Sequence, residues 1–148
     1  MVGIRSELVQ LTFAIVVLAT ARIVWARERL SEKEIDAWTH VQEDAITCVA
    51  YFNFGRVCAP KNAKPDELKH MDQMIDQMNH LALTIASRIG TKDKADVIFS
   101  RLRQAMKEQA DLTERSCTNF TLLTTRYMDR CKLLGLRPEV SFREYMNK

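Results

Sequence analysis

The chain has 148 residues, 47% of them hydrophobic, which is enough for one ordinary core and too little for two comfortable domains. Four glycines and three prolines are few for an all-β protein, which turns about every 8–12 residues, so helices are favoured. The net charge is +3 with both signs interspersed, and this excludes the strongly basic surface that nucleic-acid-binding proteins use.

The N-terminal segment has the organisation of a secretory signal peptide. Arg5 precedes an apolar run without charges, and small residues follow this run as far as Ala26. We therefore predict that residues 1–26 form a signal peptide that is cleaved after Ala26, with Ala21 as the second choice. The remainder would then be exported to the periplasm.

An uncleaved membrane anchor is the alternative for the same segment. Residues 8–25 are predominantly apolar and lie at the short limit for a helix that spans a bilayer. In this case the protein would be held at the inner membrane through residues 1–26. In both cases residues 27–148 are expected to form a single helical domain.

The first helix of this domain begins at a capping box, Ser31-Glu32-Lys33-Glu34, in which two side chains satisfy free backbone N–H groups. A hydrophobic stripe follows at helical spacing and is expected to end near Gly55: Trp38, Val41, Ala45, Cys48 and Phe52. Residues 45–54 are apolar on nearly all sides, so this helix is predicted to be central or covered by another element.

Further helices are predicted after Pro65, which suits the first position of a helix. Apolar residues recur there in steps of three and four until Gly90: Leu68, Met71, Ile75, Met78, Ala82, Ile85 and Ile89. Thr91 is expected to cap the next helical segment. The pattern over residues 94–134 permits either one long helix or two, and the C-terminal tail is expected to add a short helix that packs on the others.

The four cysteines, Cys48, Cys58, Cys117 and Cys131, are predicted to form two disulfides, as is usual in a small exported protein. If their segments are helical, the first two lie about 15 Å apart and the last two about 21 Å apart. A disulfide needs Cα atoms within about 7 Å. Each bridge must therefore join the first segment to the last.

The relative direction of these segments decides the pairing. Antiparallel segments pair Cys48 with Cys131 and Cys58 with Cys117, whereas parallel segments exchange the partners. The antiparallel order fits better, because extended chain before Cys58 lengthens the first arm to about 20 Å. It requires a helix break near residues 113–118 and predicts an up-down four-helix bundle. A single helix would favour the parallel pairing, and free cysteines in a cytosolic bundle are the remaining alternative.

Several motifs between the capping box and residue 134 occur together. They are Cys48-Val-Ala-Tyr-Phe ahead of Cys58, and Cys117-x-Asn followed by Leu123, Tyr127 and Cys131-Lys-x-Leu. With these motifs the chain resembles small four-cysteine helical proteins of the bacterial periplasm, a resemblance that implies the scaffold and no particular activity. The nine residues between Cys48 and Cys58 are also similar to the helical hairpins of the mitochondrial intermembrane space. The thirteen residues between Cys117 and Cys131 depart from that pattern.

A segment rich in methionine and histidine raises the hypothesis of copper binding. It runs from His70 to His80, and its candidate ligands are His70, Met71 and Met74, since soft sulfur ligands suit Cu(I). Met71 also belongs to the hydrophobic stripe, and His80 lies about 15 Å from His70 along a helix. We therefore favour packing of the methionines in the core and expect no metal or other cofactor.

The sequence contains no recognisable catalytic motif. All four cysteines are assigned to disulfides, the serines lack the surroundings of a nucleophile, and phosphate-binding loops are absent. We predict that the protein is not an enzyme. It is expected to act through protein contacts, with a copper-binding protein and a membrane-anchored accessory subunit of a larger complex as the alternatives.

Three aromatic residues at the end of the first helix, Tyr51, Phe52 and Phe54, are the candidate contacts for an unknown protein partner or a homodimer. The alternative is that the C-terminal tail covers them through Phe142, Tyr145 and Met146. No nucleic acid is expected to bind, and contact with a membrane is expected only through the N-terminal segment if it is not cleaved.

Overall fold

The computed structural model describes residues 29–92 and 94–148, and these residues are helical without any β-strand. This confirms the all-helical class. The chain separates into two units, Met1–Leu30 and Ser31–Lys148, of which the second holds every helix described here. The predicted signal peptide or anchor lies outside the described residues. Among the described helices, none has the length and apolar character needed to cross a membrane.

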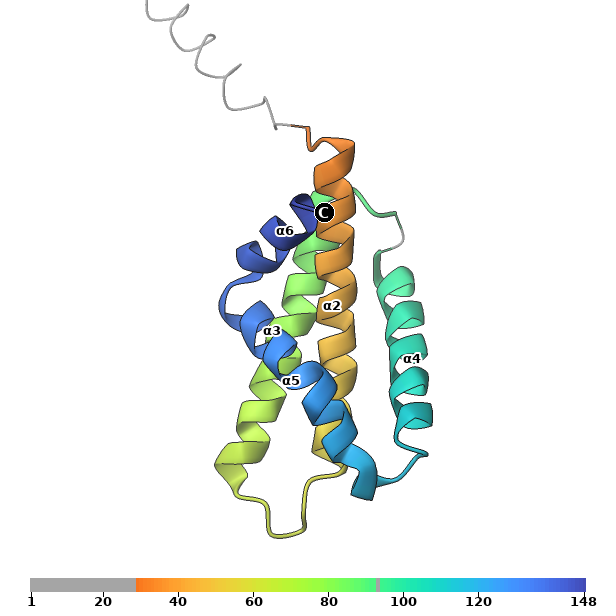
Figure 1. Ribbon diagram of the computed structural model, residues 1–148, viewed down its shortest axis with the longest axis vertical. Coiled ribbons are helices and arrows are strands. Elements are labelled where there is room, and N and C mark those ends of the chain that lie inside the picture. Colours follow the sequence, from red (N-terminus) through yellow and green to blue (C-terminus); the bar gives the residue numbers. More distant parts are fainter. Residues whose placement is uncertain (1–28, 93) are drawn as a thin grey trace, which may run out of the picture. The chain divides into compact units, whose positions relative to one another are not determined.

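Helix α2, Glu32–Val57, begins at the predicted capping box and continues two residues beyond Gly55. The N–H of Glu34 donates to Ser31 Oγ (3.3 Å), and the N–H of Ser31 donates to Glu34 Oε2 (2.8 Å). The carboxylate of Glu34 accepts hydrogen bonds from the N–H and the hydroxyl of Ser31, and these lower the pKa of Glu34 because they favour its charged form. Helix α2 packs against α3, α4, α5 and α6, which explains why its second half is apolar on nearly all sides (Figure 1).

Helix α3, Pro65–Arg88, has Pro65 in its first turn as predicted. The chain leaves it through Gly90, whose φ of 75° is a left-handed conformation that glycine adopts without strain. Helix α4, Lys94–Leu112, begins three residues after Thr91. The expectation that Thr91 caps this helix is therefore wrong, because a cap residue directly precedes the first helical residue.

The segment that the sequence left ambiguous contains two helices. After α4, Glu114 and Arg115 adopt φ angles of 52° and 58°, which a continuing helix does not tolerate. A short 3₁₀ helix, η1 (Cys117–Asn119), then leads into α5, Phe120–Leu136. The break lies in the predicted region, and the side chain of Asn119 stabilises it by donating to the carbonyl of Thr113 (3.1 Å).

Successive helices alternate in direction. The chain runs down α2, up α3, down α4 and back up α5, and then enters α6, Pro138–Met146, which packs against α2 and α5 (Figure 1). The hydrophobic core forms around α2 where these helices meet it. Its fully buried members with larger side chains include Val41, Val49, Met78, Ile85, Leu123 and Leu134.

Candidate functional site

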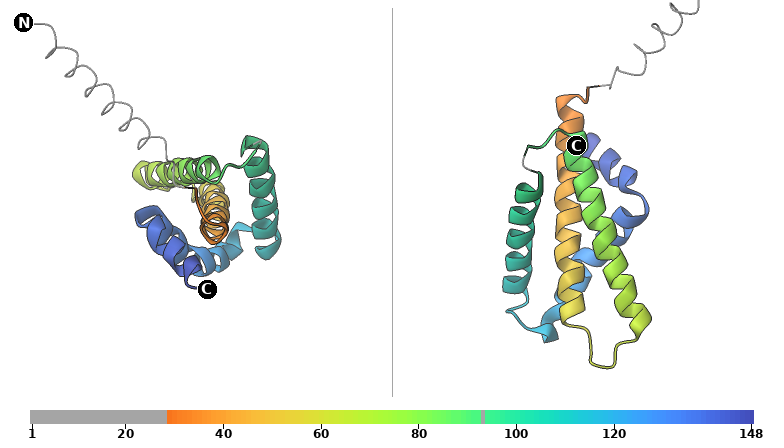
Figure 2. Two further views of the ribbon diagram at one scale, coloured as in Figure 1. Left: turned by 90° about the horizontal axis from the view of Figure 1, so that it is seen from above. Right: turned by 180° about the vertical axis from the view of Figure 1, so that it is seen from behind.

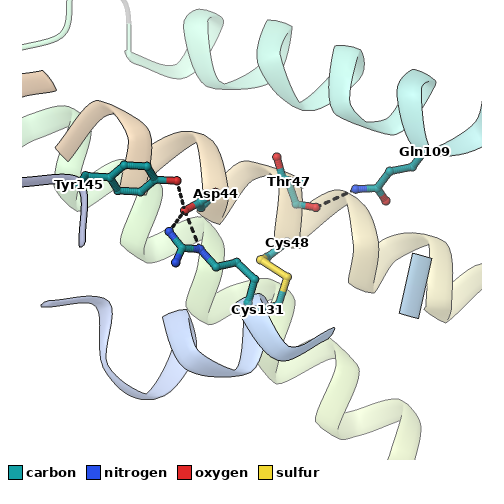
Figure 3. The surroundings of a disulfide bond; sticks show 7 residues. Asp44, Thr47, Cys48, Gln109, Cys131 and Tyr145 are labelled. Carbon is teal, nitrogen blue, oxygen red and sulfur yellow. Dashed lines mark hydrogen bonds and ion pairs between the residues drawn. A yellow bond between two sulfur atoms is a disulfide. The ribbon is translucent and has the colours of Figure 1, made fainter. Parts of the chain in front are cut away.

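Both disulfides join α2 to the C-terminal part of the chain. Cys48 is bonded to Cys131 and Cys58 to Cys117, with Cα atoms 5.5 and 5.2 Å apart. This is the pairing that an antiparallel order predicts. The first bridge, which Figure 3 shows, is buried, with Cys48 1% and Cys131 0% exposed. Cys117 of the second bridge is exposed. Two disulfides indicate folding in an oxidising environment, as expected for an exported chain.

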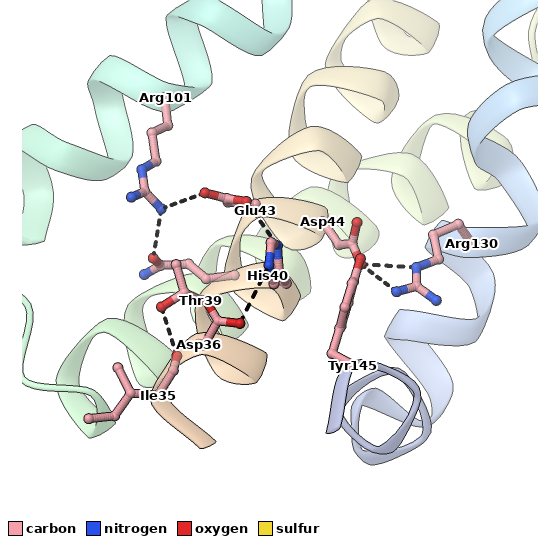
Figure 4. A network of polar contacts seen from close by, with 10 residues as sticks. Ile35, Asp36, Thr39, His40, Glu43, Asp44, Arg101, Arg130 and Tyr145 are labelled. Carbon is pink, nitrogen blue, oxygen red and sulfur yellow. Dashed lines mark hydrogen bonds and ion pairs between the residues drawn. The ribbon is translucent and has the colours of Figure 1, made fainter. Parts of the chain in front are cut away.

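A polar network next to the buried disulfide connects α2, α5 and α6. Asp44 on α2 accepts hydrogen bonds from the guanidinium of Arg130 (2.6 and 3.0 Å) and from the hydroxyl of Tyr145 (2.9 Å). Arg130 also donates to Glu144 (2.6 Å). Figure 4 shows Tyr145 of α6 and Arg130 of α5 meeting the same carboxylate. This network fixes the C-terminal helix to the rest of the fold.

Arg130 pairs with both carboxylates of the network. Burial lowers the pKa of Arg130, but the hydrogen bonds to Asp44 and Glu144 outweigh it, so that this pKa is raised. Burial, and then the charge of Asp44, raise the pKa of Tyr145. This network could not be predicted from the sequence, since Asp44 lies 86 residues from Arg130 and 101 residues from Tyr145 along the chain. All its ionic groups have partners, which is typical of a structural role.

The aromatic end of α2 is covered by α5 and not by the C-terminal tail. Tyr51 is only 3% exposed and its ring stacks on Phe120 at 5.6 Å, while Phe54 stacks on the same ring at 6.2 Å. Phe52 and Phe54 are half-buried. Tyr51 therefore has no surface to offer a partner, which corrects the prediction for this residue.

The C-terminal tail covers the opposite end of α2. Phe142 stacks on Trp38 at 4.4 Å, and Tyr145 stacks on His40 at 4.9 Å. The tail thus forms the predicted short helix but covers different residues from those that the sequence suggested. The difference follows from the direction of α5, which places its start beside the end of α2.

The candidate copper ligands do not converge on one site. His70 is exposed, whereas Met71 and Met74 are half-buried. The sulfur of Met71 lies 3.8 Å from where a Cβ would be at Gly55, and the methyl of Met74 lies 3.0 Å from that position at Gly135. The two thioethers therefore fill space beside glycines. Within residues 29–92 and 94–148, no cluster of three histidine, cysteine or acidic side chains is arranged to hold a metal ion.

A groove of about 340 Å³ lies between α2 and α4. Arg101 crosses this region and pairs with Glu43 (3.5 Å), as Figure 4 shows. It also donates to the side chain of Gln42 (3.3 Å). The groove is lined by Glu43, Ile46, Thr47, Arg101, Gln104, Ala105 and Glu108. None of these lining residues is a histidine, cysteine or serine.

The side of α4 that does not face α2 carries an apolar stripe. Phe99 is 58% exposed and Met106 is 45% exposed, and their spacing of seven residues places them on the same side of the helix, two turns apart. Helix α4 packs chiefly against α2 and lies at one side of the molecule (Figure 2). We use the name α4 stripe for Ala95, Phe99, Leu102, Met106 and Ala110, of which Leu102 and Ala110 are half-buried and Leu102 also packs against the hydrophobic core.

The α4 stripe differs from the other exposed apolar residues of the described chain. Val57 and Leu136 are the last residues of their helices, and Leu83 and Leu122 belong to two different helices. Phe99 and Met106, in contrast, are exposed large apolar side chains two turns apart on one face of one helix. The sequence analysis did not single out Phe99 and Met106, although their spacing of seven residues was visible.

No protein-family model matches the chain, and no curated protein and no solved structure is significantly similar to it. A function therefore has to be inferred from the residues of the chain itself.

Proposed function

We propose that this chain is an exported, non-enzymatic helical protein of the bacterial periplasm that acts by binding another protein through the α4 stripe. The observation that carries the proposal is the exposure of Phe99, 58% of whose surface faces solvent in a well-formed helix. An apolar stripe with an exposed aromatic ring is the usual mark of a protein contact, because its burial on binding is favourable.

The location is supported by the two disulfides and by the signal-like N-terminal sequence. We further propose that α2, α3, α4 and α5 form an up-down four-helix bundle on which α6 packs as an additional helix. Sequencing of the mature N-terminus tests export directly. Loss of residues 1–26 supports a cleaved signal peptide, and their retention supports the membrane anchor.

The shape of the α4 stripe fits a helix as its counterpart. A helix of 19 residues is about 28 Å long. The apolar positions recur every three or four residues along it, which is the spacing that a second helix laid along α4 would meet. Charged residues border the stripe, as they do at the rim of protein interfaces.

Site-specific photo-cross-linking in living cells tests this contact. A photoreactive phenylalanine analogue is placed at Phe99, and in a matched control at Leu122, which is 50% exposed on α5. We expect a discrete cross-linked adduct from position 99 and none from position 122. Absence of an adduct at position 99, or equal adducts at both positions, would contradict the proposal.

A further inference from the structure

We propose that the α4 stripe binds α4 of a second copy of this chain, with the two helices antiparallel about a two-fold axis. This proposal rests on the function proposed above and names its partner. A two-fold contact requires a self-complementary surface, in which residue i meets residue j and residue j meets residue i. The α4 stripe and the charges beside it have this property.

The apolar residues interlock in one register. If the axis crosses α4 between Arg101 and Leu102, a residue of one copy lies opposite the residue of the second copy for which the two residue numbers add up to 203. Phe99 then lies at the height of position 104 along the second copy's helix. At this height it fits between Leu102 and Met106 of the second copy's stripe. This is the arrangement of a knob between the neighbouring residues of a facing helix. Ala95 falls in the same way between Met106 and Ala110, where small residues let the helices approach.

The polar residues beside the stripe are compatible with the same register. Asp96, Ser100, Arg103 and Lys107 follow one flank of α4, between about 40° and 100° around the helix from Phe99. An antiparallel partner is turned end over end, so the same flanks of both helices meet. In the register given, Asp96 is opposite Lys107 of the second copy and Ser100 is opposite Arg103. Because of the two-fold symmetry, each pair occurs twice.

The state of these charges in the single chain agrees with this assignment. Asp96 and Lys107 are both exposed, and neither forms an ion pair with any other residue that the structure describes. In a parallel pair the same flanks would lie on opposite sides of the interface, and Asp96 would not meet Lys107 of the second copy. The pairing of these two charges therefore requires the antiparallel arrangement.

Charge reversal provides a sharp test by sedimentation equilibrium of the disulfide-bonded protein. We expect the unchanged chain to form dimers. D96K alone and K107E alone each place like charges together twice, and we expect each to weaken the dimer by about tenfold. An equimolar mixture of the two variants restores both attractive pairs and is expected to regain the wild-type dissociation constant. The double variant D96K/K107E is expected to regain it as well.

A second pair of variants separates the apolar contact from a general effect on folding. F99E is expected to weaken the dimer by about a hundredfold, since an aromatic residue at the centre of an interface contributes most. L122E, at a similarly exposed position on α5, is expected to leave it unchanged. Helical content measured by circular dichroism, unchanged in all variants, shows that they fold.

The outcomes distinguish this proposal from the function on which it rests. A wild-type chain that stays monomeric at millimolar concentration, or a mixture that fails to regain dimerisation, overturns the second copy as partner. If position 99 then still yields an adduct in cells, with the mass of a different protein, the proposed function stands. If position 99 yields no adduct, both proposals fail.

Discussion

Removal of the buried disulfide is expected to destabilise the protein more than removal of the exposed one. The relevant variants are C48A/C131A and C58A/C117A, each of which deletes one bridge and leaves the other in place. The bridges span 83 and 59 residues along the chain. The Cys58–Cys117 bridge lies inside the loop that the Cys48–Cys131 bridge closes. When one bridge is present, the other therefore restricts a shorter stretch of chain than its own sequence separation.

The magnitude follows from the chain that each bridge still constrains. With Cys58–Cys117 intact, the Cys48–Cys131 bridge closes only the difference of 24 residues, which corresponds to about 3.5 kcal/mol in the loop-entropy description. With Cys48–Cys131 intact, the Cys58–Cys117 bridge contributes a similar value of about 3 kcal/mol. Cys48 and Cys131 are also buried, so that truncation to alanine leaves a void and adds about 1–2 kcal/mol. The totals are about 5 and about 3 kcal/mol.

Urea unfolding of the two variants and of the unchanged protein, followed by circular dichroism, measures these losses. We expect both midpoints to fall, with the larger fall for C48A/C131A. An equal or larger loss for C58A/C117A would refute the assignment of extra stability to burial of the first bridge.

Three further outcomes follow from the site residues. Y145F is expected to lose about 1 kcal/mol with the hydrogen bond to Asp44. The folded-state pKa of Tyr145 is raised above 10.0, so the stability that this side chain contributes is present below pH 10 and is lost as pH rises through that raised pKa. Melting curves at pH 8–11 should therefore show a smaller loss of stability at alkaline pH for Y145F than for the unchanged protein. Graded treatment with dithiothreitol is expected to reduce Cys58–Cys117 first, since Cys117 is exposed, and differential alkylation with peptide mass spectrometry would reveal the opposite order if burial does not govern it. Titration with Cu(I) is expected to show no stoichiometric site, because Met71 and Met74 pack beside glycines, and a site that disappears in M74A would revive the copper hypothesis.

Features that depend on neighbouring residues in the chain were accessible from the sequence. The capping box at Ser31 marks the start of α2, and Pro65 and Gly90 delimit α3, because the backbone requirements at those positions are local. The disulfide pairing was also accessible, since helix geometry and the limits of a disulfide leave few arrangements.

Features that depend on how the helices approach one another could not be predicted from the sequence. Asp44 and Tyr145 carry no mark of their meeting, which arises only when α6 packs on the start of α2. The aromatic end of α2 was misjudged for the same reason, because the stacking of Tyr51 on Phe120 depends on the direction of α5. Exposure of Phe99 likewise requires knowing which side of α4 faces α2.

The redox state of the cysteines in protein taken from its native cells tests the account most directly. Thiols are blocked at lysis, and the disulfide-linked peptides are then identified by mass spectrometry without reduction. We expect no blocked cysteine, together with linked peptides joining Cys48 to Cys131 and Cys58 to Cys117. Four blocked thiols would contradict both the architecture and the proposed export.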